Sequence, residues 1–241
     1  MQLSLSLSFR EPQLRPDARA EKLRAVLAAA RKTDFYARRL RGTTDAEVAL
    51  AMLPPVPLKV FLENREHFRS RKIAAGNWLK KLGFPAEALA GSQAELAALR
   101  SAPRGARRVV VYTRLGERLM DAGLRERLWE AFELPVFEQL RGFEGELLAS
   151  ECDAHEGLHL ETGSAIFEQI GGELVVTSLI ARQTPVLRLQ TGLSGSIVAH
   201  ECPCGASATR FLPAAAPAAD RKPPAVEWSG RALALLAHGS R

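Results

Sequence analysis

The chain has 241 residues and a mass of 26.3 kDa, enough for one large domain or two small ones. Its 46% hydrophobic and 25% charged residues are typical of a globular protein and exclude a disordered tail and a collagen-like chain. The opening MQLSLSLSF does not look like a signal peptide and no long apolar run follows, so a cytoplasmic protein without a membrane span is expected. The net charge of +6 is uneven, with 15 Lys and Arg against 8 Asp and Glu in residues 1–72.

Helical patterns dominate the first 70 residues. Apolar residues recur at helical spacing from Leu23 to Ala30, which predicts a helix over 17–31 with Asp17 as its N-cap. Three further helices are expected, in chain order, over 35–40 with Asp34 as the cap, over 46–52 and over 58–68. Together they form a basic helical unit.

The next part of the chain predicts a small α/β core. Residues 71–106 show no clear period, apart from the capping-box pair Ser92 and Glu95. The run RRVVVYT at 107–113 predicts a buried strand, Asp121 can cap a helix over 122–132, and 135–140 predicts a second strand. A strand, a helix and a strand at this spacing indicate a parallel pair.

Short strands then follow one another. They are expected over 146–151, 158–161, 165–170, 173–180, 186–190 and 196–200, with a hairpin at Gly171-Gly172. This pattern favours an antiparallel, barrel-like β unit. An Ala/Pro-rich tail with a short helix at 231–237 closes the chain. The sequence therefore predicts a mixed α/β (α+β) fold in one compact domain, made of a helical unit (1–70), a partial α/β core (71–145), a β unit (146–210) and a tail (211–241).

The three cysteines point to a metal site. Their odd number and the Cys-x-Cys pair argue against a disulfide framework. The pattern is Cys152-x6-His159 followed by Cys202-Pro-Cys204-Gly, and three thiolates with one imidazole suit a closed, structural zinc site. The alternative is a set of unrelated buried thiols. Three histidines compete as the fourth ligand: His159, His155 and His200.

Several blocks of sequence resemble a known family. In chain order they are FYARRLRG, LPPVPLKVFLEN, LRERLWEAFELPVFEQLRGFE, SECDAHEGLHLE, GGELVVTSLIARQTPVLRLQTG and CPCG. They are collinear with the phenylacetate–CoA ligase branch of the adenylate-forming (acyl-CoA synthetase, AMP-binding) enzymes over about residues 17–70 and 116–206. The resemblance implies a partial adenylate-forming N-terminal domain, supports zinc and favours His159 over His155.

The departures from that family decide the expected function. Residues 65–115 hold no Gly/Ser/Thr-rich phosphate loop, and Arg141 stands in LRGFE where the family's motif has an aromatic residue. Glu144 is the candidate for that motif's carboxylate, about one residue closer than in the family. Leu193 follows QTG where the family has an aspartate, and the lysine-bearing C-terminal domain has no counterpart after Gly205. Adenylation is therefore not expected, and ATP or AMP binding is doubtful.

Three functions compete on this basis. The first is an adenylation-deficient relative, a pseudoenzyme that acts as a zinc-stabilised binding or partner subunit beside a full-length ligase, an acyl carrier or a second copy of itself. The second is a small enzyme that binds an acyl-adenylate or acyl-CoA, with Glu144, Arg141 and Arg188 as weak catalytic candidates; an ion pair is the favoured role for Arg188. The third, a nucleic-acid binder, lacks interleaved aromatic residues and is not favoured. It would use Arg38, Arg39, Arg41, Arg69, Arg71 and Lys72.

Overall fold

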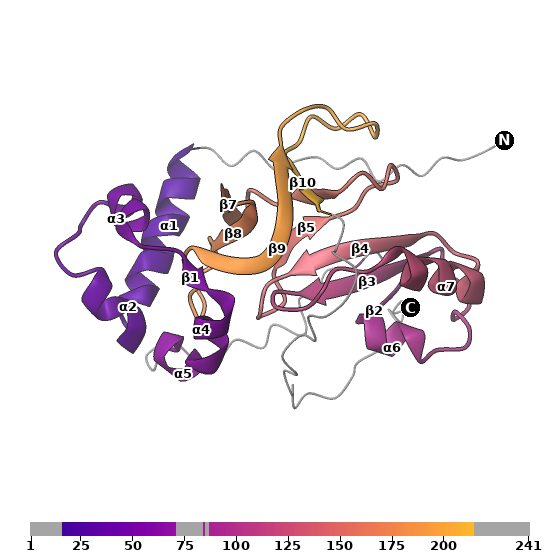
Figure 1. Cartoon of the computed structure of the whole chain (residues 1–241), viewed down its shortest axis with the longest axis horizontal. Helices are drawn as coiled ribbons and strands as arrows, with labels where there is room; N and C mark the ends of the chain where they lie inside the picture. Colours follow the sequence, from indigo (N-terminus) through magenta and orange to yellow (C-terminus); the bar gives the residue numbers. More distant parts are fainter. Residues whose placement is uncertain (1–15, 71–83, 85–86, 215–241) are drawn as a thin grey trace, which may run out of the picture.

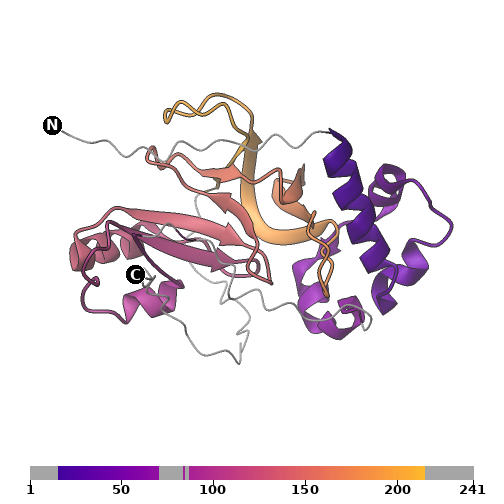
Figure 2. The ribbon, with the colours of Figure 1, turned by 180° about the vertical axis from the view of Figure 1, so that it is seen from behind.

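A computed structural model describes residues 16–70, 84 and 87–214 (Figures 1 and 2). The expected helix at 231–237, the opening MQLSLSLSF, and Arg71 and Lys72 lie outside these residues. The described chain is a mixed α/β structure, as predicted. One large sheet lies between two groups of helices, with α1–α5 gathered at one end and α6 and α7 at the other in both views.

The N-terminal helices are close to those predicted. They are α1 (Pro16–Ala30), α2 (Asp34–Arg39), α3 (Ala46–Met52), α4 (Leu58–Glu63) and α5 (Arg65–Phe68). Two predicted caps are wrong: Asp17 lies inside the first turn of α1, and Thr33 rather than Asp34 caps α2 by accepting a hydrogen bond from the Tyr36 amide. The single helix expected over 58–68 is split at Asn64, which caps both halves.

The α/β core follows the expected strand–helix–strand order. Strand β3 (Arg108–Arg114), helix α7 (Ala122–Phe132) and strand β4 (Val136–Arg141) form the unit, and β3 and β4 are parallel, which confirms that prediction. Asp121 caps α7, and Ser92 and Glu95 form the predicted capping box at α6 (Gln93–Ala97). Strand β2 (Ala88–Gly91), which the pattern did not predict, pairs in parallel with β3.

The antiparallel half continues the same sheet. Its strands are β5 (Leu147–Ser150), β6 (Leu158–Leu160), β7 (Ala165–Ile170), β8 (Glu173–Ser178), β9 (Leu189–Val198) and β10 (Arg210–Pro213). Neighbouring strands run in the order β2-β3-β4-β5-β6-β10-β9-β8-β7, and β1 (Val56–Pro57) pairs in parallel with β9. The predicted hairpin at Gly171-Gly172 joins β7 to β8. The strands described form an open sheet, so the barrel-like closure is not confirmed.

Two predictions about the end of the sheet are wrong. In place of the two strands expected over 186–190 and 196–200, one strand, β9, runs from Leu189 to Val198 and includes the gap between them. Strand β10 spans the boundary between the expected β unit and the expected tail. Strand β10 runs beside β9, and Gly195 allows the close approach, because a Cβ there would lie 2.3 Å from the Leu212 carbonyl oxygen. Without this strand β6 and β9 would not be connected within the sheet.

Two hydrophobic clusters hold the layers together. The larger joins the N-terminal helices to the antiparallel strands, and Tyr36, Phe61 and Phe68 are fully buried in it. The Tyr36 hydroxyl also donates to the Leu187 carbonyl at 3.2 Å. The smaller cluster covers β2–β4 with α6 and α7. Burial of a large apolar side chain is worth about 1.5–3 kcal/mol, so these clusters are the main source of stability.

Candidate metal centre

The turns at one end of the antiparallel strands bring three thiols and an imidazole together. Cys152 is the second residue after β5, His159 is the middle residue of β6, and Cys202 and Cys204 lie between β9 and β10. Strand β6 pairs with β5 on one side and with β10 on the other. This pairing carries residues 50 positions apart in the sequence to one point, as the cysteine and histidine pattern predicted.

The loop that carries two of the cysteines is a tight turn. The Gly205 amide donates to the Cys202 carbonyl at 2.8 Å, and the Cys202 amide donates to the Ala206 carbonyl at 3.1 Å. Gly205 has φ +83°, a left-handed conformation that glycine adopts without a Cβ penalty. The turn therefore holds both sulfurs on one side of the loop.

The spacing of the four side chains fits a tetrahedral metal ion. Their ligand atoms all lie within 4.8 Å of one another. The Cys152 and Cys202 sulfurs are 3.6 Å apart, and so are the Cys204 sulfur and His159 Nε2. Zinc bonds of about 2.3 Å to sulfur and 2.0 Å to nitrogen would place two ligand sulfurs about 3.8 Å apart and a sulfur and a nitrogen about 3.5 Å apart. The group could therefore hold a metal ion with little movement.

The thiols are reduced and mostly buried. Cys152 and Cys202 are each 2% exposed, while Cys204 lies at the surface. Burial raises the pKa of the Cys152 thiol to about 12, so in the absence of a metal this thiol keeps its proton at neutral pH. A metal ion would displace that proton on binding.

The two rival histidines lie elsewhere. His155 stacks on Phe137 with ring centroids 5.2 Å apart, and its Nδ1 lies 3.2 Å from the Arg125 guanidinium. His200 is exposed and does not belong to the group that could bind a metal. The structure thus brings His159, the histidine that the family resemblance favoured, to the three cysteines.

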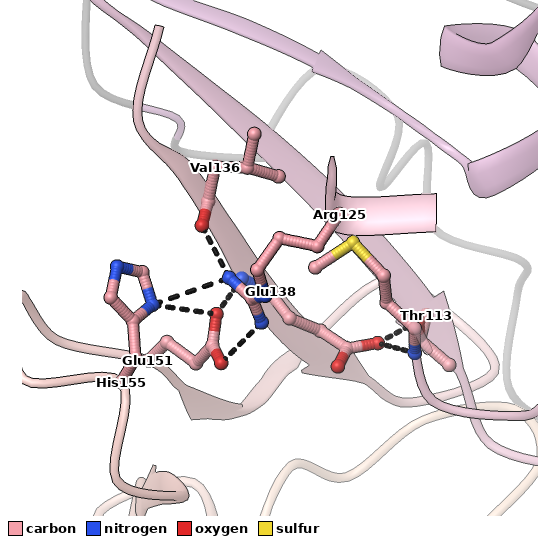
Figure 3. Close-up of polar contacts among 7 residues, drawn as sticks. Thr113, Arg125, Val136, Glu138, Glu151 and His155 are labelled. Carbon is pink, nitrogen blue, oxygen red and sulfur yellow. Dashed lines mark hydrogen bonds and ion pairs between the residues drawn. The ribbon is translucent and has the colours of Figure 1, made fainter. Parts of the chain in front are cut away.

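A second polar cluster lies next to Cys152 in the sequence (Figure 3). Arg125 donates to Glu151 at 2.6 Å and to the Val136 carbonyl at 2.5 Å. The other Glu151 oxygen accepts from the Glu138 amide at 2.7 Å, and the Glu138 carboxyl accepts from the Thr113 hydroxyl and the Met120 amide. This cluster ties α7 to β3, β4 and the residue before Cys152. It was not foreseen, because its members are far apart in the sequence.

The weak catalytic candidates Arg141 and Glu144 make internal contacts. Arg141 is 3% exposed, and its guanidinium donates to Gln139 Oε1 and to the Gly145 carbonyl. Burial lowers its pKa to about 10. Glu144 accepts from the Thr184 amide at 3.3 Å and lies 3.8 Å from Arg182.

Arg188 clamps the N-terminal helices to the sheet. Its guanidinium makes two contacts of 2.9 and 3.0 Å with the Glu168 carboxylate. Its Nη1 also donates to the carbonyls of Ala51, in the last turn of α3, and of Leu53, the C-cap of α3. The side chain is thus an internal ion pair, the role favoured from the sequence.

Sequence reasoning missed two charged residues near these candidate sites. Glu146 is 9% exposed, and its carboxylate occupies the space beside Gly142, where an added Cβ would lie 2.1 Å from it. Arg210 is 1% exposed and contacts Cys202. Neither residue lies in a recognisable motif, and Arg210 is the last residue of the expected β unit, beyond the last strand predicted there.

Among known proteins, similarity to this chain is found in the fold and not in the sequence. No protein-family model and no curated protein sequence matches the chain. An open conformation of 2-hydroxyisobutyryl-CoA ligase, in complex with 2-HIB-AMP and CoA, matches with a TM-score of 0.60 and 13% identity over 85% of this chain and 79% of that one. The same enzyme matches in its postadenylation state with 2-HIB-AMP (TM-score 0.59, 13% identity, 85% and 72% coverage). It also matches in the thioesterification state (TM-score 0.59, 14% identity, 85% and 72% coverage).

The described chain therefore has the fold of an acyl-CoA ligase. At 13–14% identity the likeness extends to the fold alone, and membership of the phenylacetate–CoA ligase branch stays a prediction. In the part of the chain that the structure describes, no helix has the length and apolar character that crossing a bilayer would require.

We expect the burial of Glu138 to make the stability of the protein depend on pH. Burial raises the pKa of this carboxyl to about 7, so the folded protein keeps a proton that the unfolded chain releases near pH 4.5. The free energy of unfolding should therefore fall as the pH rises from about 4.5 to 7, by roughly 2–3 kcal/mol at 1.36 kcal/mol per pKa unit. In Glu138→Gln this fall should disappear, as measured by urea unfolding at pH 5 and pH 8.

The matched control is Glu126→Gln, which changes an exposed glutamate on α7. Glu126→Gln should keep the pH dependence of the wild-type protein. If Glu138→Gln kept it as well, Glu138 would not be the group that titrates.

Proposed function

We propose that this protein is a zinc-stabilised member of the acyl-CoA ligase fold that does not adenylate and acts as a binding or partner subunit. One observation carries the proposal. Arg141, Glu144 and Arg188, the polar groups that the sequence offered for catalysis, all make internal contacts in the described structure. A side chain whose hydrogen bonds and ion pairs are already made within the protein has little capacity left to bind a charged substrate.

The electrostatics of these contacts support the same reading. Arg188 is neutralised by Glu168 and also bonded to two carbonyls, so moving it onto a phosphate would leave a partly buried carboxylate without its partner. Arg141 is held in place by its contacts with Gln139 and Gly145. Losing one positioned charge in an active site typically costs about 100–1000-fold in rate, so several such losses together leave little catalysis.

The segment that resembles the family's ribose-binding motif also makes internal contacts in this protein. The Thr191 hydroxyl donates to the Leu174 carbonyl at 2.8 Å, and Leu193 packs against the larger hydrophobic cluster where the family has an aspartate. A leucine there cannot accept hydrogen bonds from ribose hydroxyls. This substitution supports loss of nucleotide chemistry.

Zinc is the metal that the donor set suits. Three thiolates and one imidazole are soft or borderline ligands, and four of them close a tetrahedron. Cys152, His159, Cys202 and Cys204 would hold the ion. In this position it would link β6 to the loops that follow β5 and β9 and supply stability rather than a reacting water.

ATP–pyrophosphate exchange tests the proposal. We expect the full chain, loaded with zinc, to give no exchange above a no-acid blank with a panel of aliphatic, hydroxylated and aromatic carboxylic acids. An active acyl-CoA ligase assayed in parallel shows that the conditions support the reaction. Exchange that depends on one of the acids would overturn the proposal.

The fold neighbours favour one second candidate, the binding of a ready-made acyl-adenylate or acyl-CoA. The 2-hydroxyisobutyryl-CoA ligase structures hold 2-HIB-AMP and CoA on the same fold. Calorimetric titration with an acyl-CoA and with a non-hydrolysable acyl-adenylate analogue tests this candidate. Heat of binding with a stoichiometry near one would favour it, whereas no heat with either ligand would leave a protein partner as the proposal: a full-length ligase, an acyl carrier or a second copy of this chain.

A further inference from the structure

Arg210 is a buried arginine at the edge of the candidate metal centre. Its side chain is 1% exposed, and its Nη1 donates to the Cys202 sulfur at 3.3 Å. The same nitrogen donates to the Glu156 carbonyl at 2.8 Å, and Nη2 donates to the Glu201 carbonyl at 3.4 Å. The guanidinium therefore spans the loop before β6 and the loop after β9.

The strand pairing explains why Arg210 lies there. In the register of the sheet, Arg210 of β10 is opposite His159 of β6 and opposite Val198 of β9. His159 and Cys202 both belong to the group that could bind a metal. The backbone therefore places Arg210 directly beside the candidate ligand His159, and its side chain makes the contact with the second candidate, Cys202.

The positive charge of the buried Arg210 guanidinium needs a nearby negative charge, which its protein neighbours only partly provide. Taking the charge out of water costs several kcal/mol unless an opposite charge is near. The Glu156 carboxylate lies 3.6 Å from Nη1, but 58% of its side chain is exposed, so solvent screens the pair. The two carbonyl acceptors carry no net charge.

The metal centre would supply the missing charge. A zinc ion with three thiolates and one neutral imidazole has a net charge of −1, and the guanidinium beside one of those thiolates would bring the total to zero. The hydrogen bond from Nη1 would also fix the orientation of the Cys202 sulfur toward the metal. Both effects favour the metal-bound state over the metal-free one.

We propose that Arg210 is the charge-neutralising and positioning residue of the metal centre. The inference rests on the proposed zinc site and adds a residue outside the four ligands. Outer residues that orient metal ligands typically change metal affinity by 10–100-fold. A purely structural arginine would instead affect the metal-bound and metal-free proteins alike.

The test compares Arg210→Gln, Arg210→Lys and Glu156→Gln with the wild-type full chain. Zinc affinity is measured by competition with a chromophoric chelator, and the sulfur-to-cobalt charge-transfer band is recorded after cobalt substitution. We expect Arg210→Gln to weaken zinc binding by about 10–100-fold and to shift that band. Arg210→Lys should stay within about tenfold of the wild type. Glu156→Gln should change neither measurement.

Thermal unfolding with and without zinc separates the positioning role from a structural one. Arg210→Gln should lower the melting temperature more in the zinc-bound than in the zinc-free protein. An equal shift in both, with unchanged zinc affinity, would overturn the inference and leave the metal site standing. A folded wild-type protein that binds no zinc would overturn both. If Arg210→Gln does not fold, Arg210→Lys decides, because failure of a lysine to support zinc binding would contradict the charge role.

Discussion

Cys202→Ser is expected to lose its bound zinc and to unfold far more easily than the wild-type protein. Cys202 and Cys204 lie in the turn between β9 and β10, whereas Cys152 and His159 lie at β5 and β6, so the metal would join chain segments up to 50 residues apart. Binding of structural zinc contributes directly to folding free energy. We expect a loss of more than about 3 kcal/mol in urea unfolding, and metal analysis should fall from about one zinc per chain to none.

His155→Asn is the matched control for the ligand set. His155 has φ +51°, and asparagine tolerates this left-handed conformation better than most residues. Because His155 contacts Arg125 and Phe137 rather than the cysteines, His155→Asn should keep its zinc. The proposed ligand set would be wrong if Cys202→Ser kept the metal or His155→Asn lost it.

Arg188→Met is expected to destabilise the protein by about 3 kcal/mol, the lower end of the range for removing one partner of a buried ion pair. The Arg188 side chain is 15% exposed and contacts Glu168 through two nitrogens. Its removal leaves that carboxylate and the carbonyls of Ala51 and Leu53 without their donor. The packing of α3 against the sheet should weaken, as measured by urea unfolding.

Two comparisons make the Arg188 prediction specific. Lys59→Met breaks an ion pair whose partners are 83% and 60% exposed, and it should change stability by less than about 1 kcal/mol. A double-mutant cycle with Glu168→Gln should give a coupling energy of about 1–3 kcal/mol. Arg188 would not be a clamp if Arg188→Met cost no more than Lys59→Met.

Local patterns predicted the elements whose signals lie close together in the sequence. The run VVV at 109–111, the cap Asp121 and the second strand lie within one short stretch, and the structure confirms this unit as a parallel pair. The hairpin at Gly171-Gly172 is confirmed for the same reason. The cysteine pattern singled out the three cysteines but left three histidines open; the family resemblance favoured His159, and the structure places His159 beside the cysteines.

Features that depend on distant pairing could not be predicted. Strand β9 begins after Arg188, whose φ of +45° breaks the apolar run 186–190, and then continues through polar and glycine residues. Those residues form a strand because β10 and β8 pair with them on either side. Strand β10 begins at Arg210, the last residue before the expected tail, and carries it to the metal centre. Its local sequence holds no sign of that contact.

X-ray absorption at the zinc edge tests the central claim most directly. The protein is purified without added metal, and the ligand shell is fitted from its spectrum. We predict about one zinc per chain, surrounded by three sulfurs at about 2.3 Å and one nitrogen at about 2.0 Å. A folded protein without zinc, or a zinc shell dominated by oxygen, would contradict it.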